Sequence, residues 1–487
     1  MNTTIQFAVL LIFLIFINFS CQEQTTPSQS MTATQTVGNS LTKARTVDGR
    51  YISWKEHLID DITISGADLS GSDGLEMADL DGDGYEDVVS VHESDTEYDG
   101  ALEGNIRLAF GSANPDQWEL MTLAEGKEAA AAEDIALADV NGDGYIDILV
   151  ACELAHIIYF QNPGKEARTK QWERIIPTKT TNRGSFIRVF TADLNQDGRV
   201  EIIVANKGNQ ANDGSKPVQP KPTAISFFEI IGNPLNDNAW KEHELLKMKL
   251  PINAMPIDID KDGDIDIIGG ARGERRIVLF ENQSSDKSFQ FQTHPIQIEG
   301  LDSTSYVTGF CMAFLDVNQD EKLDILLGEN FVNLIALEQP ASFTQSWTIK
   351  RIGSTKPDWV AGLALADLNS DGLSDVIVGG YSRGPRAKDG AVTLDKPLGR
   401  IAWFENVDNP QNDWIRHDIS RRKRGMFDGF EARDLDKDGD LDLISTRGNS
   451  VTYDGVFWLE QIRSTEAKST FQAARKKDSE EVGLIDG

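Results

Sequence analysis

The nine residues Asp79-Leu-Asp-Gly-Asp-Gly-Tyr-Glu-Asp87 decide the fold of this chain, because the pattern returns six more times. Each copy has carboxylate or amide oxygens at positions 1, 3 and 5 and a carboxylate at position 9. Oxygen ligands on alternate residues of a tight loop suit Ca²⁺, which takes about six to eight of them. Position 12 is never the bidentate Glu of an EF-hand, and an apolar run follows each copy. We therefore expect each loop to lead into a strand rather than a helix.

Up to seven structural Ca²⁺ ions, one for each loop, are predicted. The predicted ligands are Asp79, Asp81, Asp83, Asp87, Asp139, Asn141, Asp143, Asp147, Asp193, Asn195, Asp197, Glu201, Asp258, Asp260, Asp262, Asp266, Asp316, Asn318, Asp320, Asp324, Asp367, Asn369, Asp371, Asp375, Asp434, Asp436, Asp438 and Asp442. The fifth loop is the weakest candidate, because Glu321 replaces the Gly at position 6 and a positive φ is costly for a non-Gly residue.

The spacing between successive loops, 51 to 67 residues, is typical of a propeller or repeat array. Each unit divides into four strands, and four antiparallel strands make one propeller blade. The seventh unit lacks its Trp-led fourth strand, while a spare one around Trp54 precedes the first unit. The N-terminal strand is therefore predicted to complete the last blade and close the ring. We expect an all-β, seven-bladed β-propeller over residues 51–463, with a Ca²⁺ loop in each blade.

The repeated Asp-x-Asp/Asn-x-Asp-Gly-x-x-Asp pattern followed by an apolar strand resembles the FG-GAP/VCBS-type propellers, which include the integrin α-chain head. The resemblance covers residues 51–463. It implies Ca²⁺ in the loop between the first and second strands of each blade. It implies little about activity, because this fold serves adhesins, lectins and lyases alike.

The N-terminus is predicted to be an export signal. An uninterrupted apolar run from Phe7 to Ile17 is too short to span a bilayer and fits the core of a signal peptide. Residues 1–21 resemble a bacterial lipoprotein signal, in which Cys21 becomes the lipidated N-terminus, although no Lys or Arg precedes the core. We expect an outer-membrane lipoprotein on the periplasmic or cell-surface side, with plain secretion as the alternative.

Residues 22–50 are predicted to form a flexible tether, and residues 464–487 a mobile charged tail. The net charge of −31 argues against nucleic acid or an anionic membrane surface as a partner. The membrane would be reached only through the N-terminal lipid, and a monomer is expected. Cys152 and Cys311 are predicted to be small packed residues, with a disulfide between them as the alternative.

The repeats lose their uniformity just after the second strands, where the chain should reach the face opposite the loops. Arg275, Tyr306 and Trp359 are expected on that face as well. Arginine pairs bidentately with carboxylate or sulfate, so a basic ring there suits an anionic uronic-acid or sulfated sugar. The alternative is that these cations pair with some of the 78 acidic residues. The predicted substrate-binding residues are Arg183, Arg188, Lys207, Arg272, Arg383, Arg447 and Tyr381.

Catalysis on this face would be a β-elimination, with His92, His156 and Tyr98 as the predicted catalytic residues. Arginine would neutralise the uronate carboxylate, while His or Tyr removes the adjacent proton. A weaker similarity, without a motif matched residue by residue, is to ulvan-oligosaccharide dehydratases and propeller polysaccharide lyases. It implies a carbohydrate-active lyase acting on uronic-acid glycans such as ulvan oligosaccharides. The alternative hypothesis is a non-catalytic surface propeller that binds carbohydrate or serves adhesion. The other histidines, on the outer strands, are predicted to be structural: His57, His243, His294 and His417.

Overall fold

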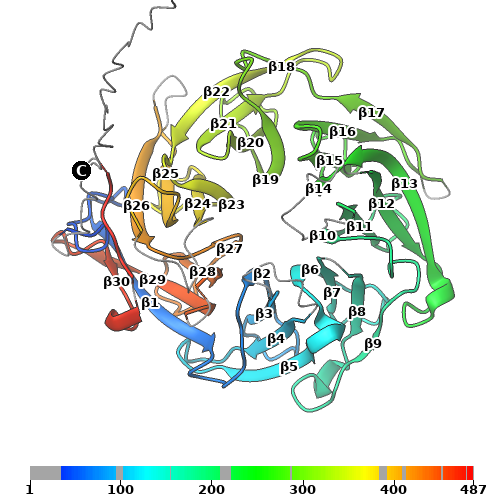
Figure 1. Cartoon of the computed structure of the whole chain (residues 1–487), viewed down its shortest axis with the longest axis horizontal. Helices are drawn as coiled ribbons and strands as arrows, with labels where there is room; N and C mark the ends of the chain where they lie inside the picture. Colours follow the sequence, from blue (N-terminus) through cyan, green and yellow to red (C-terminus); the bar gives the residue numbers. More distant parts are fainter. Residues whose placement is uncertain are drawn as a thin grey trace, which may run out of the picture.

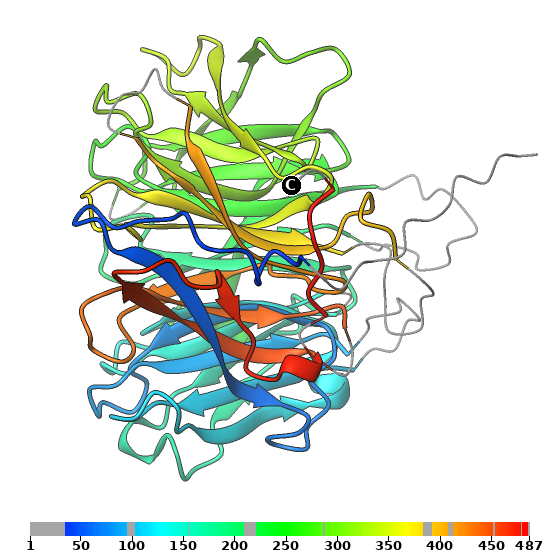
Figure 2. The same cartoon turned by 90° about the vertical axis from the view of Figure 1, so that its left-hand side faces the viewer.

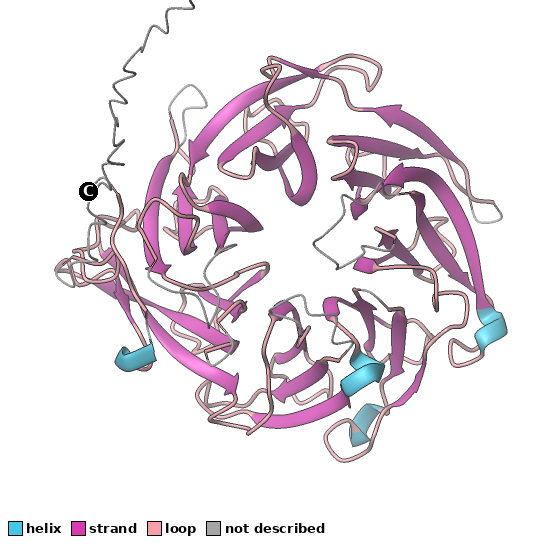
Figure 3. Ribbon diagram, viewed as in Figure 1, coloured by secondary structure: helices cyan, strands magenta, loops and turns pink. Residues whose placement is uncertain are grey.

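The computed structural model describes residues 35–94, 103–153, 155–208, 221–285, 288–382, 392–407, 413–450, 453–478 and 480–485. These residues form seven sheets arranged in a ring, which confirms the all-β, seven-bladed propeller (Figure 1). Helical structure in this part of the chain is limited to short turns (Figure 3). No described helix is long and apolar enough to cross a membrane. Three predicted site residues lie outside the described residues, namely Cys21, Tyr98 and Arg383.

The first four blades follow the chain in order. Blade 1 contains β2 (Ser72–Ala78), β3 (Asp87–His92), β4 (Asn105–Phe110) and β5 (Glu119–Glu125). Blade 2 contains β6 (Ala132–Ala138), β7 (Asp147–Cys152), β8 (Ile157–Gln161) and β9 (Glu173–Ile175). Blade 3 contains β10 (Phe186–Ala192), β11 (Glu201–Asn206), β12 (Pro222–Ile230) and β13 (Trp240–Lys249). Blade 4 contains β14 (Pro251–Ile257), β15 (Asp266–Ala271), β16 (Arg276–Asn282) and β17 (Phe291–Pro295).

The last three blades complete the ring, and two of them have five strands. Blade 5 contains β19 (Val307–Leu315), β20 (Asp324–Glu329), β21 (Asn333–Glu338), β22 (Trp347–Ser354) and β18 (Ile298–Glu299). Blade 6 contains β23 (Trp359–Ala366), β24 (Asp375–Tyr381), β25 (Gly399–Glu405) and β26 (Ile415–Arg422). Blade 7 contains β27 (Phe430–Arg433), β28 (Asp442–Arg447), β29 (Gly455–Ser464), β1 (Tyr51–Asp61) and β30 (Phe471–Gln472). The 3₁₀ turns are η1 (Gly126–Ala129), η2 (Gly164–Glu166), η3 (Asp237–Ala239) and η4 (Lys476–Asp478).

Apolar side chains hold each blade to the next. The second strands β3 and β7 are buried along their whole length, because both faces of each blade are covered by neighbours. Val89 of blade 1 and Ile148 of blade 2 belong to one apolar cluster, and Trp172 of an outer segment is buried in it. Burial on both sides explains why these strands are continuously apolar in sequence instead of alternating. The two described cysteines are free, with Cys152 buried and Cys311 half-buried.

Histidines on four outer strands pair with glutamates on the neighbouring third strands, a contact that fits the structural role predicted for them. In each pair the imidazole Nε2 lies 2.6 to 2.8 Å from a carboxylate oxygen. The same spacing therefore recurs around the ring as a cross-strand contact. The pairs are His57–Glu460, His243–Glu229, His294–Glu281 and His417–Glu405.

The N-terminal strand lies in the last blade. β1 pairs antiparallel with β29, from Tyr51 opposite Ser464 to Asp61 opposite Gly455. Trp54 is buried at this junction, like the other outer-strand tryptophans. Figure 2 shows the N-terminal segment in blue beside the C-terminal segment in red. β1 is thus the fourth strand of blade 7.

The prediction of a mobile tail over residues 464–487 is wrong for its described part. β30 pairs in parallel with β1, with Phe471 opposite Trp54. Phe471 and Val482 are buried, and Arg475 forms an ion pair with Asp61. A few apolar residues spaced through a charged segment are enough to anchor it, because each removes apolar surface from water.

The predicted tether over residues 22–50 is also packed from residue 35 onward. Val37 and Ala44 are buried, and the N–H of Val37 donates to the carbonyl of Val482 at 3.0 Å. The N–H of Ile52 donates to the carbonyl of Ala44 at 3.0 Å. The described part of this stretch therefore belongs to the folded body, and the polar composition alone was misleading.

Candidate metal loops and ligand face

The seven Asp-rich loops join the first and second strands of their blades, so they share one face of the ring. In the first loop the carboxylate of Asp79 accepts hydrogen bonds from the N–H groups of Gly82 (2.8 Å), Asp83 (3.1 Å) and Gly84 (2.9 Å). Gly82 and Gly84 have φ values of 76° and 88°, which favour glycine. Asp139 makes the same three contacts in the second loop. The backbone of the loop thus curves around the position-1 carboxylate.

Three loops bring carboxylates close enough to share one cation. In each of them, ligand oxygens from three residues lie within 4.8 Å of one another. An oxygen-only donor set on a tightly wound loop fits a hard cation such as Ca²⁺. In the first loop, Arg168 also pairs with Asp81 of this set and with the neighbouring Asp83. The three sets are Asp79, Asp81 and Asp87; Asp258, Asp260 and Asp262; and Asp434, Asp436 and Asp438.

The position-9 carboxylate connects the loop to the third strand through hydrogen bonds. Asp87 Oδ2 accepts a hydrogen bond from the N–H of Leu80 (2.8 Å), and Oδ1 accepts one from Gly111 (2.9 Å). Burial raises the pKa of Asp87 to about 7, and these two hydrogen bonds act in the opposite direction. Five other loops repeat both bonds through Asp147, Asp266, Asp324, Asp375 and Asp442.

An amide side chain at the end of the third strand ties neighbouring blades together. Asn162 Nδ2 of blade 2 donates to the carbonyl of Leu80 in blade 1 at 2.8 Å, and to the carbonyl of Ile146 at 2.9 Å. Asn282 reaches Leu194 of the preceding blade at 2.8 Å. In the sequence, the recurring Glu/Gln-Asn at this position was the signal for this bond between blades, which sequence reasoning did not predict. The contact recurs as Gln339 to Ile259 and Gln461 to Leu368.

The fifth loop keeps its winding despite the substitution at position 6. Glu321 adopts a φ of 71°, and its N–H donates to Asp316 Oδ2 at 2.8 Å. The corresponding Gly198 of the third loop makes the same bond to Asp193 at 2.8 Å. Glu321 therefore adopts a left-handed backbone conformation that is unfavourable for a non-Gly residue, and the loop keeps its shape.

His92 lies in the interior, so the expectation that it faces a ligand is not met. Its side chain is 0% exposed, and its ring nitrogens lie 2.7 Å from Ser72 Oγ and 3.0 Å from Ser90 Oγ. Burial, followed by the charge of Arg107, lowers the pKa of His92 to about 3. The imidazole is neutral at neutral pH and joins β2 to β3. His156 is half-buried beside the carbonyl of Glu128 at 2.8 Å, and burial lowers its pKa too.

The predicted basic ring is largely neutralised by acidic neighbours, as the alternative hypothesis held. Three of its members, Arg188, Lys207 and Arg447, are buried. Arg272 is half-buried and engaged with other residues. These side chains act as internal counter-charges rather than as an open anion site. The ion pairs are Arg183–Glu242, Arg188–Asp428, Lys207–Glu153 and Arg447–Glu480.

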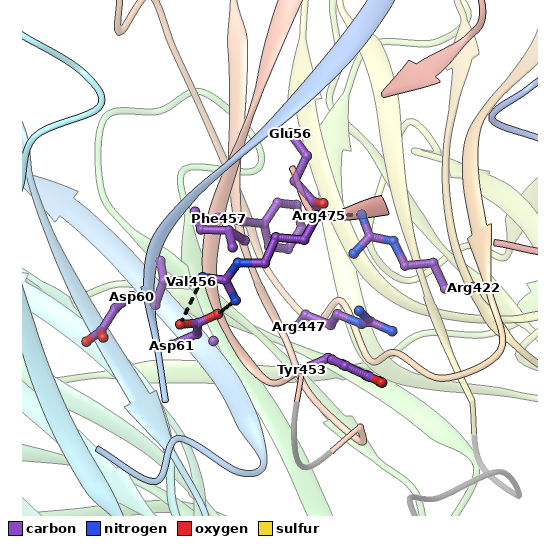
Figure 4. Close-up of a pocket in the computed structure, with 11 residues that line it drawn as sticks. Glu56, Asp60, Asp61, Arg422, Arg447, Tyr453, Val456, Phe457 and Arg475 are labelled. Carbon is purple, nitrogen blue, oxygen red and sulfur yellow. Dashed lines mark hydrogen bonds and ion pairs between the residues drawn. The ribbon is translucent and has the colours of Figure 1, made fainter. Parts of the chain in front are cut away.

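Arg447 lines a small pocket beside β1 rather than the central channel (Figure 4). Its guanidinium lies 5.3 Å from the ring centre of Tyr453 and 3.0 Å from a carboxylate oxygen of Glu480. Figure 4 shows Arg475 reaching Asp61 in the same pocket. The charges of the pocket therefore hold the C-terminal segment against the last blade.

The innermost strands of all seven blades line a central cavity. Arg188 of blade 3 lies within it and contacts Asp428 of blade 7 at 2.6 Å and Asp134 of blade 2 at 3.4 Å. Burial raises the pKa of Asp134 to about 6, and the charge of Arg188 opposes this shift. The predicted substrate-binding Arg188 thus joins three blades across the channel.

Four aromatic rings form a row on the face opposite the loops. Tyr306 precedes β19, Phe331 lies between β20 and β21, Trp359 begins β23 and Tyr381 ends β24. The ring centres of Tyr306 and Phe331 are 5.9 Å apart, those of Phe331 and Trp359 are 5.1 Å apart and stacked, and those of Trp359 and Tyr381 are 6.0 Å apart. All four residues are half-buried, so each keeps exposed surface. Sequence reasoning placed three of them on this face and missed Phe331.

Arg275 stands at the end of this row. Its guanidinium carbon lies 4.4 Å from the ring centre of Tyr306, a cation–π distance. Arg275 is exposed and forms no ion pair with any residue that the structure describes. Arg275 is more exposed than the described members of the predicted basic ring, which are half-buried or buried. A cation therefore borders the aromatic row.

The blades and their recurring loops define a propeller built from sequence repeats, and comparison with known protein families identifies the repeat. The FG-GAP-like repeat matches residues 79–150, 139–204, 258–327 and 316–378, which together make up about half of the chain. The chain belongs to the FG-GAP-like repeat family, which confirms the resemblance drawn from the loops. Its sequence has no match among curated proteins.

Solved structures with a similar fold include two distant propellers. YCF48 from Cyanidioschyzon merolae is 8% identical with a TM-score of 0.46, covering 84% of this chain and 98% of that chain. BBS1N, solved in complex with ARL6DN, is 11% identical with a TM-score of 0.45, covering 88% of this chain and 100% of that chain. Similarity at this level carries no information on function.

Proposed function

We propose that this protein is a non-catalytic propeller that binds anionic carbohydrate across the row Tyr306, Phe331, Trp359 and Tyr381. The row is the observation that carries the proposal. The C–H groups on a sugar face are weakly positive and complement the negative face of an aromatic ring. Four adjacent rings offer a track for several sugar units, whereas isolated surface aromatics are ordinary.

Arg275 supports the choice of an anionic ligand. An exposed guanidinium without an acidic partner among the described residues can pair bidentately with a uronate carboxylate or a sulfate ester. Its position over Tyr306 puts this charge beside the track. A glycan that carries both sugar faces and carboxylates would use both features at once.

β-Elimination, the other hypothesis, has less support. A base must reach the proton that it removes, and His92 is buried and neutral. Three of the arginines meant to neutralise the uronate, Arg183, Arg188 and Arg447, are paired with glutamate or aspartate. Binding requires neither group, so it is the better-supported function.

Calcium and the arrangement of the chain ends complete the proposal. Up to seven Ca²⁺ ions would be held by the Asp-rich loops, where they would stiffen the blades. The pairing of β1 with β29 would close the ring and keep the aromatic track rigid. Lipidation at Cys21 would display this monomeric propeller on the outer membrane of a bacterium, with secretion as the alternative.

Isothermal titration of the calcium-loaded protein with a glycan panel tests the proposal. The panel contains ulvan oligosaccharides, oligogalacturonate and a neutral oligosaccharide. Trp359→Ala should weaken binding of every ligand by at least about tenfold, which corresponds to about 1.4 kcal/mol. Arg275→Ala should weaken only the binding of charged ligands. Absence of binding across the panel, or full binding by Trp359→Ala, would contradict the proposal.

Tyr51→Ala is the matched control. Tyr51 is a half-buried aromatic with Arg45 over its ring at 3.7 Å, but it lies on the outer strand of blade 7. Its replacement should leave the affinity unchanged. Ultraviolet absorbance of the same mixtures reports unsaturated uronate. A steady rise in this absorbance would show that the protein is an eliminase and would contradict the non-catalytic binding function.

A further inference from the structure

Three buried carboxylates meet near the face that carries the aromatic row, between blades 1 and 2. Asp73 lies in β2, Glu93 follows β3 and Glu133 lies in β6, and oxygens of all three lie within 4.8 Å of one another. Their exposed fractions are 0%, 8% and 6%. β2 and β6 run from this end of the blade to the Asp-rich loops, so the cluster is separate from the loop sites.

Two cations near the cluster are already paired with other acids. Lys207 pairs with Glu153, and Arg188 pairs with Asp428. Lys207 is close enough to feel the charges of the three carboxylates, yet a single ammonium shared with Glu153 cannot balance them. The interior therefore holds more negative than positive charge at this point.

Asp73 gives a second and independent indication of a missing partner. Both of its carboxylate oxygens are buried, and no described residue donates a hydrogen bond to them while Glu93 is ionised. A buried carboxylate loses its hydration, and native structures rarely leave such oxygens without a donor or a cation. One of its oxygens lies within 4.8 Å of an oxygen of Glu93 and an oxygen of Glu133, so a ligand between them would be coordinated by all three residues.

We propose that Asp73, Glu93 and Glu133 bind one divalent cation of the hard, oxygen-seeking class, such as Ca²⁺, Mg²⁺ or Mn²⁺. Carboxylates without nitrogen or sulfur ligands select this class. The ion would bridge blade 1, through Asp73 and Glu93, to blade 2, through Glu133. It would act as an inter-blade clamp on the side of the ring opposite the loops, and it does not depend on the proposed carbohydrate binding.

A protonated cluster is the competing state. Burial and the charges of its neighbours raise the pKa of Asp73 and of Glu93, so shared protons would also relieve the repulsion. The two states differ in anomalous scattering of X-rays, because Mn²⁺ scatters anomalously and a proton does not.

Crystals of the full chain soaked in MnCl₂ at neutral pH give the decisive measurement. The expected result is an anomalous peak about 2.0–2.6 Å from oxygens of Asp73, Glu93 and Glu133. Peaks in the Asp-rich loops would show that the metal has entered the crystal. Occupied loops with no peak in the cluster would overturn the proposal in favour of protonation.

Manganese bound after equilibrium dialysis gives a test in solution. Glu133→Gln and Asp73→Asn should each lose one equivalent of Mn²⁺ relative to the wild type, with the loop sites retained. Glu76→Gln is the matched control, because Glu76 lies on the same strand as Asp73 but outside the cluster. An unchanged stoichiometry in both cluster variants would refute the site. Should these variants fail to fold, the wild-type anomalous map decides alone.

Discussion

Glu481 is a residue through which pH acts on the two packed ends of the chain. Its Oε2 accepts a hydrogen bond from the N–H of Gly38 at 3.0 Å. Its Oε1 is buried and accepts no hydrogen bond from the described residues. Burial raises the pKa of Glu481 from 4.5 to about 8, although the charge of Arg422 opposes the shift. The folded state therefore favours the neutral carboxyl.

Glu481→Gln should remove this pH dependence. Between pH 4.5 and 8 the unfolded wild type loses the proton before the folded one does, so wild-type stability falls as pH rises. Glutamine stays neutral, and the variant should be more stable than the wild type above pH 8. We expect a difference on the order of 1 kcal/mol, reduced from the full shift because the tail can undock locally. Thermal unfolding of both proteins at pH 5 and pH 8.5 checks this; equal differences at the two pH values would contradict it.

The repeat pattern predicted where residues lie along the strands better than it predicted how deeply they are buried. It placed His92 and Lys207 at the ends of second strands, where the structure has them. It could not reveal that both are buried, since burial depends on what neighbouring blades supply. Tyr381 was assigned to the ligand face and lies in the aromatic row there, beside Trp359. Burial and ion pairing, which the repeat pattern does not reveal, mark His92 and Lys207 as structural residues.

At the scale of strands and loops, Asn162 shows that the blades are connected by specific bonds as well as by apolar packing. The side chain is 2% exposed and bonds to carbonyls of its own blade and of blade 1. Asn162→Ala would leave both carbonyls without a donor. We expect a loss of about 2–4 kcal/mol in the free energy of unfolding, because buried groups without partners are costly. Urea denaturation followed by tryptophan fluorescence measures it.

Asn406→Ala is the matched comparison for the inter-blade bond. Asn406 occupies the same position in blade 6, but its Nδ2 donates to Ser374 of its own blade, at 3.2 Å. The carbonyl of Val317 in the preceding blade is bonded instead by Lys350 at 2.8 Å. Asn406→Ala should cost about 1 kcal/mol. Equal losses in the two variants would mean that the inter-blade bond adds nothing.

For the whole molecule, counting strands predicted the ring, because repeated loops and apolar runs recur in every unit. The packed terminal segments were not predictable in the same way. They contain no repeat, and their contacts join residues far apart in sequence, such as Val37 with Val482 and Arg475 with Asp61. Composition suggested mobility, while long-range packing decides the outcome.

Calcium removal tests the loops as a set. A ligand that binds only the folded state stabilises it, by about 2.7 kcal/mol for each site when the free ion is at one hundred times its dissociation constant. Excess EGTA should therefore lower the melting temperature by several degrees in calorimetry, and added Ca²⁺, but not an equal concentration of Mg²⁺, should restore it. Asp258→Asn, at position 1 of a loop with three clustered carboxylates, should shrink this calcium-dependent shift. A melting temperature unaffected by EGTA would show that the winding around Asp79 and its counterparts is sustained by backbone hydrogen bonds alone.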